Sequence, residues 1–303
     1  EKLNLKYEDK LQKFDAFRKR YLGIEEASGT RVQDWQTYDA YVVGSDIVWG
    51  KEFSGLDPVY FLQFAPDEST KIAYAASTIL LESGQTENDE VFSERLPFFD
   101  AIAVRETSSV EKIQSFVSNK VVDVLDPTLL LTKEDYVALE VETTEMYEKP
   151  YMLSYFLTHD PAVVDYTNMI AEKLGLRVIH YFADYPDRVF NSDAGCFAFA
   201  GPGEFLGYVK NAQFIFTNSF HGTCFSMIYR KPFRTYTAKR AMLSRVKDMV
   251  RKLDMGNQCF ENFHNLSEVS LNIDYTQFED RLKEQQVKSI GFLEGALKGK
   301  KNV

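Results

Sequence analysis

Apolar, strand-like runs alternate with helical patterns along most of the chain. The strand-like runs are "AYVVG" (40–44), "KIAYAAS" (71–77), "AIAVRE" (101–106), "KVVDVLDP" (120–127), "YMLSYFL" (151–157), "LRVIHYF" (176–182) and "QFIFTN" (213–218). Between several of them, stretches such as "AVVDYTNMIAEKLG" and "GEFLGYVKNA" repeat apolar residues at helical spacing. Continuous apolar strands that alternate with helices are typical of parallel sheets covered on both faces, so the pattern predicts an α/β fold.

A charged segment, "EVETTEMYEKP" (140–150), interrupts this alternation before it starts again. At 303 residues the chain is long enough for two cores. We therefore predict two Rossmann-like, doubly wound domains that face each other across a cleft, one over residues 1–148 and one over residues 149–274. The last amphipathic helix, over residues 275–298, is expected to pack back on the N-terminal domain.

Charge and cysteine content narrow the classes of function. The formal net charge of −10 argues against nucleic acid as a partner, and an anionic substrate would need a local positive site. The three cysteines, Cys196, Cys224 and Cys259, are far apart and form no CxxC pair, which indicates a reduced, cytoplasmic protein without a metal site. No apolar run approaches the roughly 18 residues that a transmembrane helix needs.

Polar residues follow several of the predicted strands directly. The stretches concerned are Gly44-Ser45-Asp46, Arg105-Glu106, Asp126-Pro127, Ser154-Tyr155 and Asn218 to Gly222. Ligands of open parallel sheets bind beyond the carboxyl ends of the strands, so these residues are candidates for a site. Taken singly, each of them could instead cap the next helix or form a turn.

His221 is the strongest single candidate for chemistry. Asn218 or Ser219 can cap the helix that follows, and Gly222 would let a ligand approach the backbone closely. The N-terminus of a helix suits a phosphate group, and a histidine placed there can act as a general acid or base. A structural histidine with satisfied hydrogen bonds is the alternative.

Arg105 ends a buried strand, where an unpaired guanidinium would be costly. Its partner is either a carboxylate, which Glu106 or Asp126 could supply, or the anion of a substrate. For Arg245 a position on a helix surface is the simpler interpretation. Tyr155, like Trp49 and Tyr181, could stack on a sugar ring or could belong to a core.

Several familiar signatures are absent from the sequence. It has no GxGxxG after a strand, no GxxxxGK[ST] and no GxSxG. His159, His180 and His264 have no metal-ligand spacing. The sequence therefore indicates neither a P-loop enzyme, nor a serine hydrolase of that type, nor a metalloenzyme.

Five stretches occur in the order seen in polysaccharide pyruvyl transferases, and the chain resembles this family from the first helix to about residue 255. These are "YDAYVVGSDIVWG" (38–50), "KIAYAAS" (71–77), "AVRETSSVE" (103–111), "DVLDPTLLL" (123–131) and "FLGYVKNAQFIFTNSFHGTCFSMIYRKPF" (205–233). The resemblance implies a glycosyltransferase-B-like fold. It also implies transfer of the pyruvyl group of phosphoenolpyruvate to a sugar of a surface polysaccharide or of its lipid-linked precursor, as a cyclic ketal. Phosphoenolpyruvate would be the donor substrate, with no cofactor, and the protein could lie peripherally at the inner membrane.

The resemblance also assigns roles, residue by residue. The His-Gly turn of the family falls on His221, the arginine after the mid-domain strand on Arg105, and a downstream Ser-Arg on Ser244 and Arg245. His221 would move the proton. Arg105, Arg245 and the helix start from Asn218 to Gly222 would bind carboxylate and phosphate. The remaining positions expected to contact substrate are Ser45, Asp46, Asp126 and Tyr155.

The sequence departs from the family in two places. Many members carry arginine where this chain has Ser219, and the first strand of the family would precede the opening helix, so the N-terminal domain is expected to lack that strand. Two other functions stay open: a nucleotide-sugar-dependent glycosyltransferase of the same architecture, and a non-catalytic, carbohydrate-binding relative.

Overall fold

The computed structural model describes residues 2–22, 38–78, 88–157, 160–182, 196–197, 199–237, 244–263 and 269–299, so His159 and His264 lie outside the described residues. The chain divides into two compact units. The His221 unit comprises Glu1–Ala27, Leu131–Lys239 and Met255–Tyr275. The Arg105 unit comprises Ser28–Leu130, Arg240–Asp254 and Thr276–Val303.

A four-stranded parallel sheet in the order β1-β2-β3-β4 forms the centre of the Arg105 unit. Its strands are β1 (Ala40–Val43), β2 (Thr70–Ala76), β3 (Ala101–Val104) and β4 (Val121–Asp123). Its helices are α2 (Lys51–Ser54), α3 (Asp89–Arg95), α4 (Val110–Gln114), α10 (Ser244–Lys252) and α11 (Thr276–Lys298). All four strands were predicted from their apolar runs.

A six-stranded parallel sheet in the order β10-β9-β8-β5-β6-β7 forms the centre of the His221 unit. Its strands are β5 (Tyr151–Phe156), β6 (Arg177–Phe182), β7 (Cys196–Phe197), β8 (Phe214–Thr217), β9 (Phe233–Tyr236) and β10 (Cys259–Phe260). Its helices are α1 (Lys2–Phe17), α5 (Lys133–Tyr136), α6 (Glu145–Glu148), α7 (Pro161–Leu174), α8 (Pro202–Asn211) and α9 (Phe220–Ile228). The prediction of an α/β fold with parallel sheets is confirmed, although the short strands β7, β9 and β10 were not foreseen.

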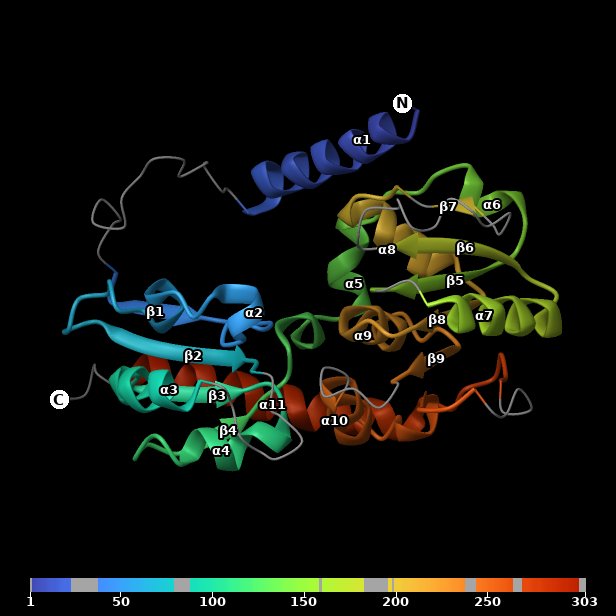
Figure 1. The fold of residues 1–303 in the computed structure, drawn as a ribbon. Helices are drawn as coiled ribbons and strands as arrows, with labels where there is room; N and C mark the ends of the chain where they lie inside the picture. The colour runs from blue at the N-terminus through green and yellow to red at the C-terminus, as the bar shows by residue number, and fades with distance from the viewer. Residues whose placement is uncertain are drawn as a thin grey trace. The chain divides into compact units, whose positions relative to one another are not determined.

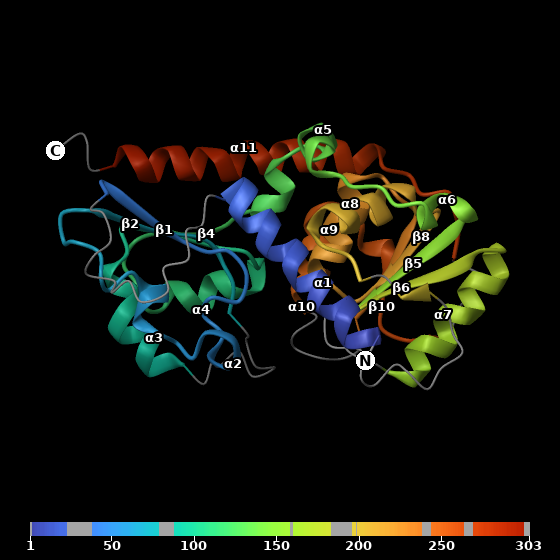
Figure 2. The ribbon, with the colours of Figure 1, turned by 90° about the horizontal axis from the view of Figure 1, so that it is seen from above.

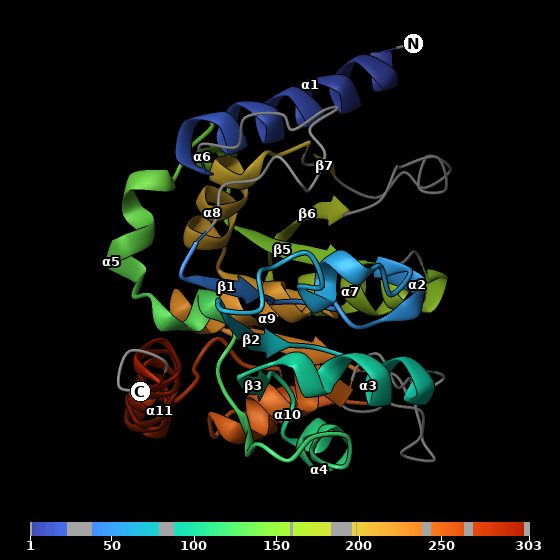
Figure 3. The ribbon, with the colours of Figure 1, turned by 90° about the vertical axis from the view of Figure 1, so that its left-hand side faces the viewer.

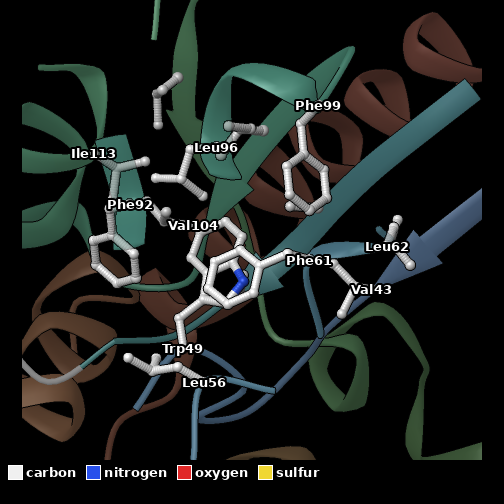
Figure 4. Close-up of a cluster of buried hydrophobic side chains, with 14 of the residues drawn as sticks. Val43, Trp49, Leu56, Phe61, Leu62, Phe92, Leu96, Phe99, Val104 and Ile113 are labelled. Carbon is white, nitrogen blue, oxygen red and sulfur yellow. The ribbon is translucent and has the colours of Figure 1, made fainter. Parts of the chain in front are cut away.

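Helices cover both faces of the sheet in the Arg105 unit (Figures 1 and 2). On one face α11 packs Phe292 against Tyr74 of β2. On the other face, α3 and α4 enclose a larger core around the fully buried Trp49, whose ring stacks on Phe61 at a centroid distance of 6.0 Å (Figure 4). Burial on both faces explains why these strands are continuously apolar.

In the His221 unit, α7 lies on one face of the sheet, and α8 and α9 lie on the other (Figure 2). The bounds of α7 follow from its sequence. The Asp160 side chain accepts a hydrogen bond from the backbone N–H of Ala162, Pro161 occupies the first turn, and Gly175 ends the helix with φ of +66°. Figures 1 and 3 show α1 beside α8, where Lys13 pairs with Glu204 at 3.1 Å.

The chain passes between the two units several times, and the crossing nearest the predicted boundary at 140–150 lies between Leu130 and Leu131. Residues of that segment pack on α8 instead. Val141 donates its backbone N–H to the carbonyl of Gly203 at 3.0 Å, and the ammonium of Lys210 contacts Glu140 at 2.7 Å. These contacts explain why a segment rich in charge belongs to the compact His221 unit.

Candidate functional site

At the carboxyl end of the sheet in the Arg105 unit lies a buried cluster of ion pairs. Arg105 follows β3 directly and is 4% exposed. Its Nε donates to Glu106 Oε1 at 3.1 Å, its Nη1 to Asp126 Oδ2 at 3.0 Å and its Nη2 to Asp46 Oδ1 at 3.2 Å. Of the two predicted kinds of partner for Arg105, the structure shows the carboxylates.

Hydroxyl groups hold the carboxylates of this cluster in place. Ser45 Oγ donates to Asp126 Oδ2 at 2.9 Å, and Thr128 Oγ1 donates to Asp126 Oδ1 at 2.8 Å. Ser77 Oγ donates to Glu106 Oε1 at 2.7 Å. Ser45 therefore holds Asp126, and Asp126 in turn pairs with Arg105, which supports a role for both in positioning the guanidinium.

An irregular backbone at the ends of β1 and β2 brings these side chains together. The register of β2 against β3 shifts between Ala73 and Ala76, and Ala75 has φ of +50°. In the adjacent turn, a Cβ on Gly44 would lie 1.9 Å from the carbonyl oxygen of Tyr74, so only glycine fits there. Irregularities of this kind are frequent next to active sites, because they redirect side chains at a strand end.

Arg245 belongs to the same cluster, which corrects its interpretation as a helix-surface residue. It lies in the first turn of α10, is 7% exposed, and its Nη1 is 3.7 Å from Asp46 Oδ1. The Arg245 side chain is buried because α10 packs the neighbouring Val246, Met249 and Val250 into the protein. Val246, Met249, Val250 and Leu253 recur at helical spacing and mark the buried side of α10, and Arg245 lies one turn before Met249 at the edge of that side.

The cluster perturbs the ionisation of its own members. Burial alone would lower the pKa of Arg105, but Glu106, Asp126 and Asp46 raise it above its ordinary value. Burial, followed by the charge of Arg105, lowers the pKa of Arg245. Burial raises the pKa of the Glu106 carboxyl, although Arg105 opposes this effect. Among the described residues, no group donates a hydrogen bond to Glu106 Oε2.

Asp46 is the accessible carboxylate of the cluster. Its side chain is 59% exposed, whereas those of Glu106 and Asp126 are almost fully buried. Asp46 has φ of +62° and forms an isolated bridge with Ala76, which fixes its backbone at the end of β2. A solvent-facing carboxylate therefore sits against two buried guanidinium groups.

The start of α9 in the His221 unit is built from neutral groups. Ser219 caps the helix, because its Oγ accepts a hydrogen bond from the backbone N–H of Gly222 at 3.2 Å. Asn218 Oδ1 accepts from the backbone N–H of Leu157 at 2.9 Å and so joins the ends of β8 and β5. His221 lies in the first turn of α9, half-buried, with its ring 5.4 Å from that of Phe220.

Gly222 is buried and in close contact with its neighbours. A Cβ at this position would lie 2.6 Å from Thr217 Oγ1 and 2.8 Å from Cδ1 of Tyr155. Packing of α9 on the strand ends, rather than approach of a ligand, therefore explains the glycine. Tyr155 is half-buried, and its ring packs against Tyr181 at 5.0 Å and Phe205 at 5.4 Å.

The structure thus groups the predicted site residues at two sheet edges, each within one unit. Arg105, Arg245, Ser45, Asp46 and Asp126 are brought together in the Arg105 unit; His221, Asn218, Ser219, Gly222 and Tyr155 are brought together in the His221 unit. Thr128 was not predicted as a site residue, although its place after Asp126-Pro127 is typical of a side chain that bonds back to an aspartate. In the part of the chain that the structure describes, no group of His, Cys, Asp and Glu is arranged to hold a metal ion.

The comparison with known families covers the predicted site residues of both edges except Arg245. The family model for polysaccharide pyruvyl transferase matches residues 2–238. The chain belongs to this family. Membership in the polysaccharide pyruvyl transferase family supports a transferase that modifies polysaccharides. No curated protein matches the sequence. No described helix of this family member is long and apolar enough to cross a membrane.

Two solved structures resemble this chain at low sequence identity. A mutant O-GlcNAc transferase of Thermobaculum terrenum is 12% identical, with a TM-score of 0.45, over 86% of this chain and 52% of the other. This pyruvyl transferase family member therefore spans about half the length of that protein. The wall teichoic acid polymerase TagF is 10% identical, with a TM-score of 0.41, over 87% of this chain and 70% of the other.

Proposed function

We propose that this chain transfers the pyruvyl group of phosphoenolpyruvate to a saccharide and forms a cyclic ketal. In the proposed reaction a sugar hydroxyl adds to C2 of the enol while C3 gains a proton. A second hydroxyl then bonds to C2 as the C2–O bond to phosphate breaks, and inorganic phosphate leaves. The observation that carries the proposal is the His221 turn at the start of α9, which lies inside the segment that the family model matches.

His221 is the residue to which we assign proton transfer. Its side chain is half-buried in the first turn of α9, and Ser219 and Asn218 hold the turn on either side of it. An imidazole can deliver a proton to C3 and later receive one from a hydroxyl. Backbone N–H groups at a helix start favour an anion, so the same turn suits the negatively charged donor.

We assign Arg105 and Arg245 to the binding of a substrate anion, with Asp46 as the group that the anion displaces. Both guanidinium groups contact the Asp46 carboxylate, at 3.2 and 3.7 Å, and this carboxylate is the exposed one. A carboxylate or phosphate group could take its place without breaking the buried pairs of Arg105 with Glu106 and Asp126. In this proposal Arg105 keeps its pairs with Glu106 and Asp126 and uses the Nη2 group that Asp46 releases to bind the substrate anion.

The reaction can be tested by incubation of the protein with phosphoenolpyruvate and a panel of hexosides and oligosaccharides. The proposal requires acceptor-dependent release of phosphate and a ketal in the NMR spectrum of the product. His221→Ala should lower kcat by about 10²- to 10⁴-fold, the usual contribution of a general acid–base group, at unchanged thermal stability. Unaltered turnover in that variant would remove His221 from the mechanism.

Binding measurements separate the alternatives. Stabilisation by a nucleoside diphosphate, without any response to phosphoenolpyruvate, would favour a nucleotide-sugar-dependent transferase. Stabilisation by saccharides alone would favour a binding protein. Either result would count against the proposed donor.

Asp46→Asn tests the assignment of the anion site. If the substrate anion displaces the Asp46 carboxylate, the asparagine variant neutralises less of the charge on the two guanidinium groups. The KM for phosphoenolpyruvate should then fall while kcat changes little. If Asp46 instead takes part in the chemistry, kcat should fall. A rise in KM would contradict the displacement.

A further inference from the structure

α10 belongs to a separate segment of the Arg105 unit. The stretch Arg240–Asp254 lies in this unit, whereas the chain before it, up to Lys239, and after it, from Met255, lies in the His221 unit. The place of α10 within the Arg105 unit therefore depends on the contacts of the helix itself. This place matters because α10 carries Arg245, whose Nη1 is 3.7 Å from Asp46 Oδ1.

Apolar side chains attach α10 to the core of the unit. Val246, Met249, Val250 and Leu253 are all buried. Burial of apolar surface is favourable but non-directional, so by itself it specifies the position of a helix less sharply than a hydrogen bond does. Hydrogen bonds and ion pairs weaken quickly with distance and angle, and they can define where a helix lies along its neighbours.

A polar side of α10 makes such directional contacts. Arg245, Asp248 and Lys252 are three and then four positions apart, so they lie on one side of the helix. Asp248 Oδ2 accepts two hydrogen bonds from Ser108, one from the backbone N–H at 3.1 Å and one from Oγ at 2.6 Å. A single carboxylate oxygen thus holds both polar groups of one residue.

The pair of Ser108 and Asp248 joins the two stretches of chain that carry the arginines of the anion site. Ser108 lies three positions after Arg105, and Asp248 lies three positions after Arg245. A shift of α10 at Asp248 would therefore move Arg245 relative to Arg105.

Lys252 attaches α10 a second time. Its Nζ donates to the backbone carbonyl of Arg105 at 3.4 Å and lies 2.6 Å from Asp123 Oδ2. Lys252 is four positions after Asp248, which is about 6 Å along the helix axis. Attachment at two points this far apart restricts both the sliding and the tilting of the helix.

We propose that Asp248 and Lys252 are positioning residues of the anion site, because their contacts set where Arg245 lies relative to Arg105. The inference rests on the assignment of both arginines to a substrate anion in the proposed function. Through its charge alone, Asp248 would oppose the binding of an anion. Through its hydrogen bonds it favours binding, so removal of its side chain distinguishes the two effects by their sign.

Titration of the full chain with phosphoenolpyruvate, and separately with inorganic phosphate, measures the anion site without turnover. Asp248→Ala should raise the Kd of phosphoenolpyruvate roughly tenfold, although it removes a negative charge, since the loss of one or two hydrogen bonds is of this order. Asp248→Asn keeps an acceptor oxygen for Ser108 and should bind like the unsubstituted protein. In turnover, the alanine variant should show a raised KM at a nearly unchanged kcat.

Asp135→Ala is the matched control for Asp248→Ala. Asp135 Oδ2 accepts hydrogen bonds from the backbone N–H and from Oγ1 of Thr132, each at 2.8 Å, and this pair lies in the His221 unit. The control therefore loses the same two kinds of hydrogen bond and the same charge. Its Kd for either anion should not change.

Lys252→Met tests the second point of attachment, and Lys288→Met is its matched control. Lys288 Nζ also lies 2.6 Å from a carboxylate oxygen of Asp123, but it belongs to α11. Both variants lose one positive charge and one ion pair with the same carboxylate. Lys252→Met should raise the Kd of phosphoenolpyruvate clearly more than Lys288→Met, and equal effects would contradict the role of Lys252.

The results separate this inference from the proposed reaction. If Asp248→Ala binds the anions as tightly as the unsubstituted protein, or more tightly, the inference is overturned. It is also overturned if Asp248→Asn loses as much affinity as Asp248→Ala, or if the unsubstituted protein binds neither anion. If no ketal forms but anion binding is present and weakens in Asp248→Ala, the inference stands and the proposed reaction alone fails.

Discussion

The two sheet edges satisfy their polar groups by different kinds of interaction. At the edge of the Arg105 unit, full charges are withdrawn from water and satisfied by one another: Arg105 contacts three carboxylates. At the edge of the His221 unit, a hydroxyl and an amide satisfy backbone N–H groups, through Ser219 and Asn218. The first edge depends on ion pairs, and the second depends on neutral hydrogen bonds.

The two kinds of interaction differ in how well each edge tolerates the loss of one member. A buried ion-pair cluster requires all of its members, because the loss of one leaves the others charged and unpaired. A neutral helix cap can lose one hydrogen bond at modest cost, and it leaves the neighbouring histidine to exchange protons. The charged edge is therefore suited to hold an anion site in place, and the neutral edge is suited to present His221.

The largest effect on stability is expected at the charged edge. Arg105→Met keeps the length of the side chain but leaves Glu106 and Asp126 buried without their counter-ion. Loss of one partner from a buried pair typically costs about 3–5 kcal/mol in the free energy of unfolding. Chemical denaturation monitored by circular dichroism measures this loss.

Arg18→Met is the matched control, because Arg18 is an exposed arginine that pairs with Asp15 three positions earlier in the chain. An exposed pair of this kind contributes about 0.2–1 kcal/mol. If the two substitutions cost the same, the cluster around Arg105 does not stabilise the fold as its burial implies.

A smaller, pH-dependent effect is expected at the end of β4, where the charged edge continues. Asp123 accepts hydrogen bonds from Lys252 of α10 and Lys288 of α11, each at 2.6 Å. Burial alone would raise the pKa of Asp123, but the two lysines lower it well below its ordinary value of 3.8. A carboxyl whose pKa is lowered by folding stabilises the folded protein at any pH above the pKa of the unfolded chain, about 3.8. This contribution is lost progressively as the pH falls below 3.8.

Asp123→Asn should therefore cost about 1.5–3 kcal/mol near neutral pH, the usual range for a hydrogen bond to a charged group. The difference from the unsubstituted protein should shrink as the solution is acidified, because protonation removes the same charge. Unfolding curves across the acid range would test both statements. A difference that stays constant with pH would mean that the asparagine acts through shape rather than charge.

Much of the fold could be predicted because its signals are local. The seven predicted strands are long apolar runs, and polar residues at their ends marked both edges of interest. Local patterns could not show which charges pair across the sheet, since Asp46, Arg105 and Arg245 are far apart in the sequence and meet only after folding. For the same reason the burial of Arg245 was missed.

Other differences from the prediction also have physical causes. β7 and β10 have two residues each, too few for an alternating or apolar pattern to stand out. The segment 140–150 is charged but folds onto α8, because lysine and glutamate side chains pair with each other there. Gly222 shows a third limit of sequence-based prediction, because a glycine required by packing cannot be told in the sequence from a glycine required by a ligand.

The smallest effect, and the sharpest contrast between the edges, is expected at Ser219. Many members of the family carry arginine at this position, and arginine could add an anion contact, but its side chain cannot cap α9 as the hydroxyl does. Ser219→Arg should thus cost about 1 kcal/mol in stability, the usual value of a lost helix cap, while KM for phosphoenolpyruvate falls. Ser219→Ala should show the same loss of stability without the gain in binding, and Ser219→Asn, which retains a cap, should show neither. Because Ser219 is buried beside Thr217, a loss far above 1 kcal/mol in the arginine variant alone would indicate steric conflict instead, and the neutral edge would then tolerate change no better than the charged one.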